Sequence, residues 1–165
     1  MSTDRIEKRV LLRATRERVW RAISDSREFA RWFGVAFNEP FVEGAHLKGR
    51  IVGTQMDPQV AAQQRQYADK VFEFHVERVE PMNRISFRWH PYAVEPDVDY
   101  AKEPTTLIDF ELADAVGGTL LTIVESGFDR IPLARRAKAF TANEAGWAKQ
   151  VELIEKYLGS EGPSS

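Results

Sequence analysis

Histidines are the first side chains to consider for acid–base catalysis or metal binding, because imidazole serves both roles near neutral pH. The chain has three, His46, His75 and His90. Alternation along the strands expected around His75 and His90 places both on the face opposite the apolar side chains. We interpret them as surface residues, with a role as ligand or base as the alternative. The sequence has no cysteine and no His-x-x-x-His pair, so we expect neither a metal site nor a cofactor.

Motifs for nucleophilic or phosphate chemistry are also missing. Residues 125–127 (ESG) lack the first half of a Gly-x-Ser-x-Gly nucleophile elbow. The glycine pair at 117–118 is typical of a hairpin turn and not of a nucleotide-binding loop. Arg135, Arg136 and Lys138 form a basic cluster, which we interpret as a solvated helix face, with an anion site as the alternative. No residue is assigned a catalytic role.

Two polar residues stand where apolar ones are expected. Asn143 lies between Phe140 and Trp147 on the inward stripe of a helix. A buried amide without a partner costs about 1–3 kcal/mol, so Asn143 needs a ligand, a water or a sheet carbonyl, unless it caps its own helix. Glu125 ends the apolar strand LLTIVE and is either a polar group at a pocket rim or a solvated strand end.

One long amphipathic helix is predicted over residues 141–158. Its apolar side chains recur at spacings of four, three and four on one face: Trp147, Val151, Ile154 and Leu158. A helical segment at 131–140 precedes it. Thr141 and Glu144 form a capping box, which indicates that the helix restarts or bends there.

The pattern in the rest of the chain predicts mainly strands. Two short helices, at 16–24 and 26–33, follow the first of these strands. Strands are expected at 5–13, 37–42, 45–54, 70–80, 84–90, 105–114 and 118–126, with a bulge near 77–78. Hairpin-length connections make the sheet antiparallel. Residues 58–67 are expected to form a surface helical turn, and the acidic segment 91–104 is a lid or a tolerated insertion.

A curved sheet and a straight helix do not match everywhere, so a pocket is expected between them. Its apolar walls would come from both elements: Trp32, Phe74, Trp89, Phe110, Trp147 and Val151. Asn143 would orient a ligand and Glu125 would stand at the rim. The alternative is that these aromatic residues simply fill the core.

Bulk properties bound the class of protein. The formal net charge of −2 favours neither nucleic acid nor an anionic membrane as a partner. No window approaches the roughly 18 apolar residues of a membrane helix, and the N-terminus lacks the apolar core of a signal peptide. We therefore expect a cytoplasmic protein, with one domain at 1–158 and a disordered tail at 159–165.

Four segments together resemble a known family. They are ATRERVWRAISDSREFARWFG at 14–34, PMNRISFRW at 81–89, GTLLTIVESGFDRIP at 118–132 and NEAGWAKQVELIEKYL at 143–158. The sequence resembles the START-like (SRPBCC) superfamily. Within it, the chain is most similar to bacterial homologues of the C-terminal domain of the activator of the ninety-kilodalton heat-shock chaperone ATPase. It departs from the pattern at 43–46, where one of two expected glycines is present.

The resemblance implies an α+β helix-grip fold: a curved antiparallel sheet of about six to seven strands around a long C-terminal helix, with a hydrophobic cavity between them. It implies no shared catalytic set. The leading hypothesis is a non-enzymatic protein that binds a small apolar or amphipathic molecule in the cavity. The alternatives are a chaperone-activating or stress-response protein that contacts another protein, and a polyketide cyclase-like or hydratase-like enzyme with Glu125 as its acid. Monomer and homodimer both remain open.

Overall fold

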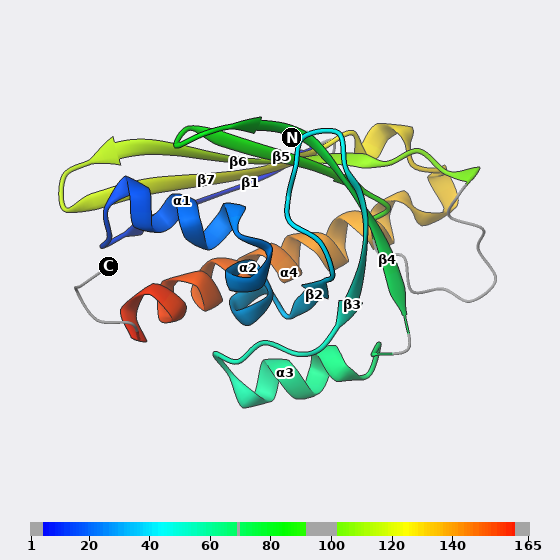
Figure 1. The fold of residues 1–165 in the computed structure, drawn as a ribbon. Helices are drawn as coiled ribbons and strands as arrows, with labels where there is room; N and C mark the ends of the chain where they lie inside the picture. Colours follow the sequence, from blue (N-terminus) through cyan, green and yellow to red (C-terminus); the bar gives the residue numbers. More distant parts are fainter. Residues whose placement is uncertain (1–4, 69, 92–101, 161–165) are drawn as a thin grey trace.

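The computed structural model describes residues 5–68, 70–91 and 102–160. The described part contains seven strands and four α-helices, and helix α4 lies along one face of the sheet (Figure 1). In chain order the elements are β1 (Arg5–Leu12), α1 (Arg16–Ser24), α2 (Ser26–Phe33), β2 (Val35–Phe37), β3 (His46–Ile51), α3 (Pro58–Arg65), β4 (Val71–Glu80), β5 (Arg84–Trp89), β6 (Thr106–Ala115), β7 (Gly118–Ser126), a 3-10 turn (Phe128–Arg130) and α4 (Leu133–Ser160).

The sheet has the strand order β1-β7-β6-β5-β4-β3-β2, and every neighbouring pair is antiparallel. The first strand therefore pairs with the last one, while the strands between them follow as hairpins and longer connections. Helices α1 and α2 pack beside the C-terminal half of α4, and α3 lies apart from the sheet (Figure 1). This arrangement confirms the predicted α+β helix-grip fold.

The predicted bulge is present in β4. Val76 pairs with Phe87 and Arg78 pairs with Ser86, so Glu77 is the extra residue. The bulge shifts the side-chain alternation by one position, and Val79 consequently packs against the core.

Local signals place the two short helices as expected. The Thr15 hydroxyl accepts a hydrogen bond from the Arg18 backbone N–H at 3.1 Å and caps α1. The Asp25 carboxylate caps α2 in the same way, accepting from two backbone N–H groups. Gly34 ends α2 at φ 92°, a left-handed conformation that glycine adopts without a steric penalty.

The β6–β7 turn explains the glycine pair. Gly117 has φ 89°, and a Cβ added to Gly118 would lie 2.0 Å from the Leu12 carbonyl oxygen. The two glycines thus serve chain reversal and close packing of β1, in agreement with the turn interpretation.

The strand predicted at 37–42 is wrong. The pairing segment is β2, Val35–Phe37, which ends before Pro40. Proline has no backbone N–H to donate to a ladder, so the pairing ends ahead of it. The helical turn predicted near 58–67 is confirmed as α3, capped by Asp57. The predicted acidic lid lies mostly outside the described residues.

Helix α4 runs without interruption from Leu133 to Ser160. The restart predicted at Thr141 is therefore wrong, because both halves of the helix pack on the same body. In the first half Phe140 contacts Phe128 with ring centroids 5.2 Å apart, and in the second half Ile154 is fully buried. The helix ends at Ser160, two residues after the predicted end at 158. Residues 161–165 are not among the described residues.

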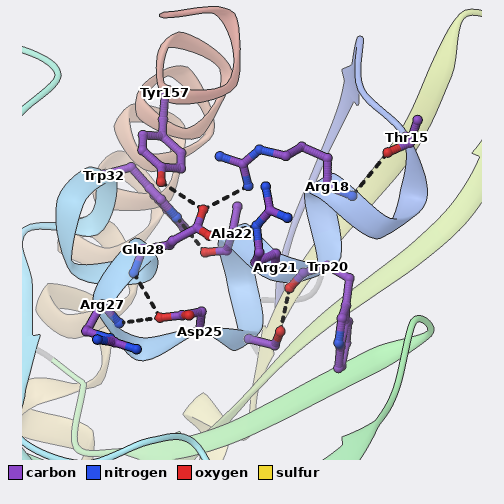
Figure 2. A network of polar contacts seen from close by, with 11 residues as sticks. Thr15, Arg18, Trp20, Arg21, Ala22, Asp25, Arg27, Glu28, Trp32 and Tyr157 are labelled. Atoms are coloured by element: carbon purple, nitrogen blue, oxygen red, sulfur yellow. Dashed lines mark hydrogen bonds and ion pairs between the residues drawn. The ribbon is translucent and has the colours of Figure 1, made fainter. Parts of the chain in front are cut away.

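A network of charged side chains joins α1, α2 and the end of α4 (Figure 2). The Glu28 carboxylate pairs with the Arg18 guanidinium at 2.8 Å and with Arg21 at 2.9 Å. The Tyr157 hydroxyl donates a further hydrogen bond to Glu28 at 2.8 Å. Arg18 is only 3% exposed, so the network anchors the helices from within the interface.

Aromatic side chains fill most of the space between sheet and helices. Phe29 is fully buried and contacts the rings of Phe33, Phe87 and Phe110 at centroid distances of 4.5, 5.9 and 6.0 Å.

In the described residues no helix is long and apolar enough to cross a membrane. The predicted cytoplasmic location stays a prediction.

Candidate functional site

The centre of the site is a carboxyl group inside the fold. Glu125 is 0% exposed, so the interpretation as a solvated strand end is wrong. Four side chains donate hydrogen bonds to its two oxygens: Trp147 Nε1 at 2.8 Å, Trp89 Nε1 at 2.7 Å, Thr106 Oγ1 at 2.5 Å, and Asn143 Nδ2 at 3.0 and 3.1 Å.

The sheet register and the helix period bring these donors together. Trp89, at the end of β5, pairs directly with Thr106 at the start of β6. Glu125 lies on the next strand, β7. Asn143 and Trp147 are four residues apart on α4 and therefore share one face. Three neighbouring strand ends and one helix face thus converge on one carboxyl group.

The donor set suits a carboxylate. An indole N–H and an amide NH₂ can only donate, so both oxygens of Glu125 act as acceptors. All four of these donors are neutral side chains. Their hydrogen bonds satisfy the buried acid in the interior.

Asn143 is not a helix cap. It lies well inside α4, and its amide donates to Glu125. The capping interpretation is therefore wrong. The partner that the inward amide required is a side chain of the sheet.

A small pocket opens to solvent beside this carboxyl group. Its volume is about 70 Å³, and its lining comes from α2, β5 and α4: Phe33, Trp89, Asn143, Gly146, Trp147 and Gln150. The aromatic rings of Phe33, Trp89 and Trp147 form its walls. Their centroid distances are 6.3 Å for Phe33–Trp89, 5.9 Å for Phe33–Trp147 and 6.0 Å for Trp89–Trp147. We call it the aromatic pocket.

Gly146 leaves space in the lining of the aromatic pocket, and Gln150 adds a polar group to that lining. A Cβ added to Gly146 would meet no atom within 4 Å, so the missing side chain leaves free space at the wall. Gln150 Nε2 donates to the Phe33 carbonyl at 3.1 Å. Gln150 Oε1 is buried and has no hydrogen-bond partner among the described residues.

The structure separates the predicted site residues into three groups. Trp89, Asn143 and Trp147 line the aromatic pocket, and Glu125 lies behind them. The remaining four are not among its lining residues: Trp32, Phe74, Phe110 and Val151. The first three are at most 2% exposed and belong to the packed core, where the Trp32 indole donates to the Ala22 carbonyl at 2.9 Å. These three side chains lie in the core, between sheet and helices, where the resemblance implied a cavity.

Three lining residues had not been predicted: Phe33, Gly146 and Gln150. Two of them carried a signal in the sequence. A glycine inside a helix costs about 1 kcal/mol relative to alanine, which points to a position where a side chain is not wanted. Gln150 lies seven residues after Asn143, on the same helix face. Phe33 carried no signal that distinguishes it from a core residue.

None of the three histidines is a lining residue of the aromatic pocket. His46 and His75 are cross-strand neighbours with ring centroids 4.3 Å apart, and His75 Nε2 lies 3.4 Å from Glu77. His90 Nε2 lies 3.1 Å from the Glu103 carbonyl oxygen. Within the described ranges, no group of three or more His, Cys, Asp or Glu residues could hold a metal ion.

The basic cluster at the start of α4 is partly internal. Arg135 is 8% exposed and pairs with the Glu103 carboxylate at 2.5 Å, so it is not part of a solvated face. Arg136 donates to the carbonyl oxygens of Ile131 and Asp129. Arg136 thus holds the chain just before α4, and Arg135 joins α4 to the segment before β6. Both guanidinium groups are engaged within the protein, which argues against an anion site.

The antiparallel sheet with the long helix α4 along one face defines a START-like domain. More specifically, the chain belongs to the family described as Activator of Hsp90 ATPase homolog 1-like protein, whose model matches residues 13–159. A search of curated proteins finds no match. The family and the fold are compatible with ligand binding.

Solved structures share this fold over nearly the whole chain. DynU16, a protein in the dynemicin biosynthetic locus, is 27% identical with a TM-score of 0.67; the alignment covers 97% of this chain and 49% of that one. The chain thus spans about half the length of DynU16. MLL2253 from Mesorhizobium loti is 18% identical with a TM-score of 0.69, covering 94% and 97%. The Aha1 dimer from Colwellia psychrerythraea is 16% identical with a TM-score of 0.65, covering 93% and 95%.

Proposed function

We propose that this protein binds a small amphipathic molecule at the aromatic pocket, without transforming it chemically. One observation carries the proposal: the pocket combines three aromatic walls with a buried acceptor, Gln150 Oε1, that has no partner among the described residues. Buried polar atoms are nearly always hydrogen-bonded, so this oxygen needs a donor from a ligand or a water. Apolar walls with a few directed polar groups are the usual composition of a small-molecule site.

The size of the aromatic pocket limits what enters it. Its volume of about 70 Å³ is small beside the roughly 300–1,000 Å³ of a typical ligand pocket. A head group of a few heavy atoms fits, and the remainder of the ligand stays outside the opening. The ligand is therefore small or anchored by one end, whereas the leading hypothesis from the sequence placed a small apolar or amphipathic molecule in a cavity between sheet and helix.

Glu125 gives the enzyme alternative no support. The carboxyl group is fully buried, already accepts hydrogen bonds from four side chains, and is not a lining residue of the aromatic pocket. A general acid must reach the proton it transfers, directly or through one water. We assign Glu125 a role in positioning Trp89, Asn143 and Trp147.

Gly146→Leu tests the proposal, because it adds a side chain at a lining position where a Cβ would meet no atom within 4 Å. The matched control is Gly159→Leu, the same change at the other glycine of α4 that meets no neighbour. Calorimetric titration with 1-hexanol, hexylamine and hexyltrimethylammonium should show binding of at least one probe to the parent protein. That binding should be lost in Gly146→Leu and kept in Gly159→Leu. Absence of binding by all three probes, or equal binding by both variants, would refute the proposal.

Protein partnership remains a second proposal, supported by family membership alone. A pull-down with the chaperone, followed by its ATPase assay, tests it. The same samples, analysed by size-exclusion chromatography with light scattering, decide between monomer and homodimer.

A further inference from the structure

We propose that the aromatic pocket selects a protonated amine, an alkylammonium head group, over neutral and anionic groups of the same length. This inference rests on the proposed function, because it names the class of ligand taken by the same site.

The Glu125 carboxyl group lies behind two of the aromatic walls. Two of the three aromatic walls, Trp89 and Trp147, donate their indole N–H groups to Glu125 at 2.7 and 2.8 Å. A hydrogen bond to a carboxylate shifts electron density toward the ring, which strengthens its attraction for a cation. The carboxylate itself adds a negative potential that is weakly screened inside the protein.

The lining of the aromatic pocket is uncharged. None of its six residues carries a charge, and the four side chains that donate hydrogen bonds to Glu125 are all neutral. A cation that enters the aromatic pocket therefore lies near a carboxyl group whose hydrogen-bond partners are neutral, which favours a cation over an anion there.

Gln150 is the polar lining residue with an unused acceptor. Its Oε1 is buried and has no hydrogen-bond partner among the described residues, while its amide nitrogen donates to the Phe33 carbonyl. We infer that the Gln150 amide turns toward the aromatic pocket and accepts from the N–H donors of a primary ammonium group, which still presents its charge to the rings. A quaternary ammonium group supplies the charge without a donor, so the two contributions can be measured separately.

The experiment compares four probes of equal chain length by calorimetric titration: hexylammonium, hexyltrimethylammonium, 1-hexanol and hexanoate. We expect hexylammonium to bind at least 10-fold more tightly than 1-hexanol, and hexanoate to bind most weakly. Gln150→Leu should weaken hexylammonium about 5-fold or more and leave hexyltrimethylammonium within 2-fold.

Glu125→Gln should reduce the preference for hexylammonium over 1-hexanol to less than 3-fold. Its matched control is Glu155→Gln, which removes the same charge from an exposed position of α4. If Glu125→Gln does not fold, the probe series on the parent protein and the Gln150→Leu comparison decide the question.

The outcomes separate this inference from the proposed function. Equal binding of 1-hexanol and hexylammonium, with both lost in Gly146→Leu, would overturn the amine preference and leave a binding site in place. Binding of no probe would overturn both. Tighter binding of hexanoate than of hexylammonium would overturn the amine preference directly.

Discussion

The role assigned to the Asn143 side chain depends on which group it hydrogen-bonds. As a first-turn residue it would cap a helix, but inside α4 its amide donates to Glu125 at 3.0 and 3.1 Å. A helix-interior asparagine has lower propensity than alanine, so only a tertiary contact explains its benefit.

Substitution by aspartate distinguishes the two roles. Asp is as good a helix cap as Asn, whereas a second carboxylate beside Glu125 replaces a donor with a like charge. We expect Asn143→Asp to lower the free energy of unfolding by at least roughly 2 kcal/mol, and Asn143→Ala by about 1–2 kcal/mol, from the value of hydrogen bonds to charged groups. Urea unfolding at pH 7 measures both. An Asn143→Asp protein as stable as the parent would contradict the Glu125 contact.

The contact between α2 and α4 depends on a charged network at the opposite end of the helix from Glu125. Glu28 pairs with Arg18 and Arg21, and Tyr157 bonds to the same carboxylate (Figure 2). Tyr157 is 3% exposed, so its hydroxyl has little access to water as a replacement partner.

Removing that hydroxyl isolates one contact of the network. We expect Tyr157→Phe to reduce the free energy of unfolding by about 1–2 kcal/mol, since the lost bond is to a charged group and the ring stays packed. Chemical denaturation measures it. The control is Tyr67→Phe on a tyrosine that is 39% exposed, which should change stability by less than about 0.5 kcal/mol. Equal effects at both tyrosines would show that the Glu28 contact contributes nothing.

Helix α3 has a pH-dependent anchor. The pKa of the Asp57 carboxyl is lowered from its usual value, chiefly by the hydrogen bond from the Val60 backbone N–H and then by the Lys156 ammonium. A lowered folded-state pKa stabilises the protein above the unfolded pKa, near 3.8. This stabilisation disappears as the pH falls through the lower folded value.

The Asp57→Asn variant keeps a capping oxygen but cannot ionise. We expect it to show a smaller loss of stability between pH 6 and pH 3 than the parent, as measured by urea unfolding at both values. Glu155→Gln, at an exposed position outside this contact, should retain the parent's pH dependence. An unchanged pH dependence in Asp57→Asn would contradict the role of this carboxylate.

At the scale of the whole molecule, one aromatic core connects all the main elements. The buried cluster includes residues of β1, α1, α2, the central strands and α4. A shared core favours cooperative unfolding, because no layer keeps its buried surface when another leaves.

We therefore expect a single unfolding transition. Tryptophan fluorescence, which reports the core through Trp32 and Trp147, and far-UV circular dichroism, which reports the helices, should give the same denaturation midpoint within error. Helix α3, where only Ala61 is buried, should exchange its amide hydrogens earlier than α4. Separate midpoints for the two probes would contradict a single cooperative core.

The sequence by itself determined most of the architecture. Alternation predicted the strands around Phe74, Phe87 and Phe110, capping residues placed α1 and α2, and the parity change at Val79 located the bulge in β4. These features depend on neighbours in the chain, so local patterns suffice. The same local patterns misplaced β2 and divided α4 at Thr141, because packing overrules a capping box and Pro40 ends a ladder.

Only the tertiary structure decided what Glu125 and Asn143 do. The sequence marked both as polar residues in apolar surroundings but left each with two interpretations. Their contact depends on strand order, on the register between β5 and β6, and on the rotation of α4, none of which is encoded within a few residues. The same long-range packing filled the expected cavity with Trp32, Phe74 and Phe110 and left the smaller aromatic pocket beside Gly146.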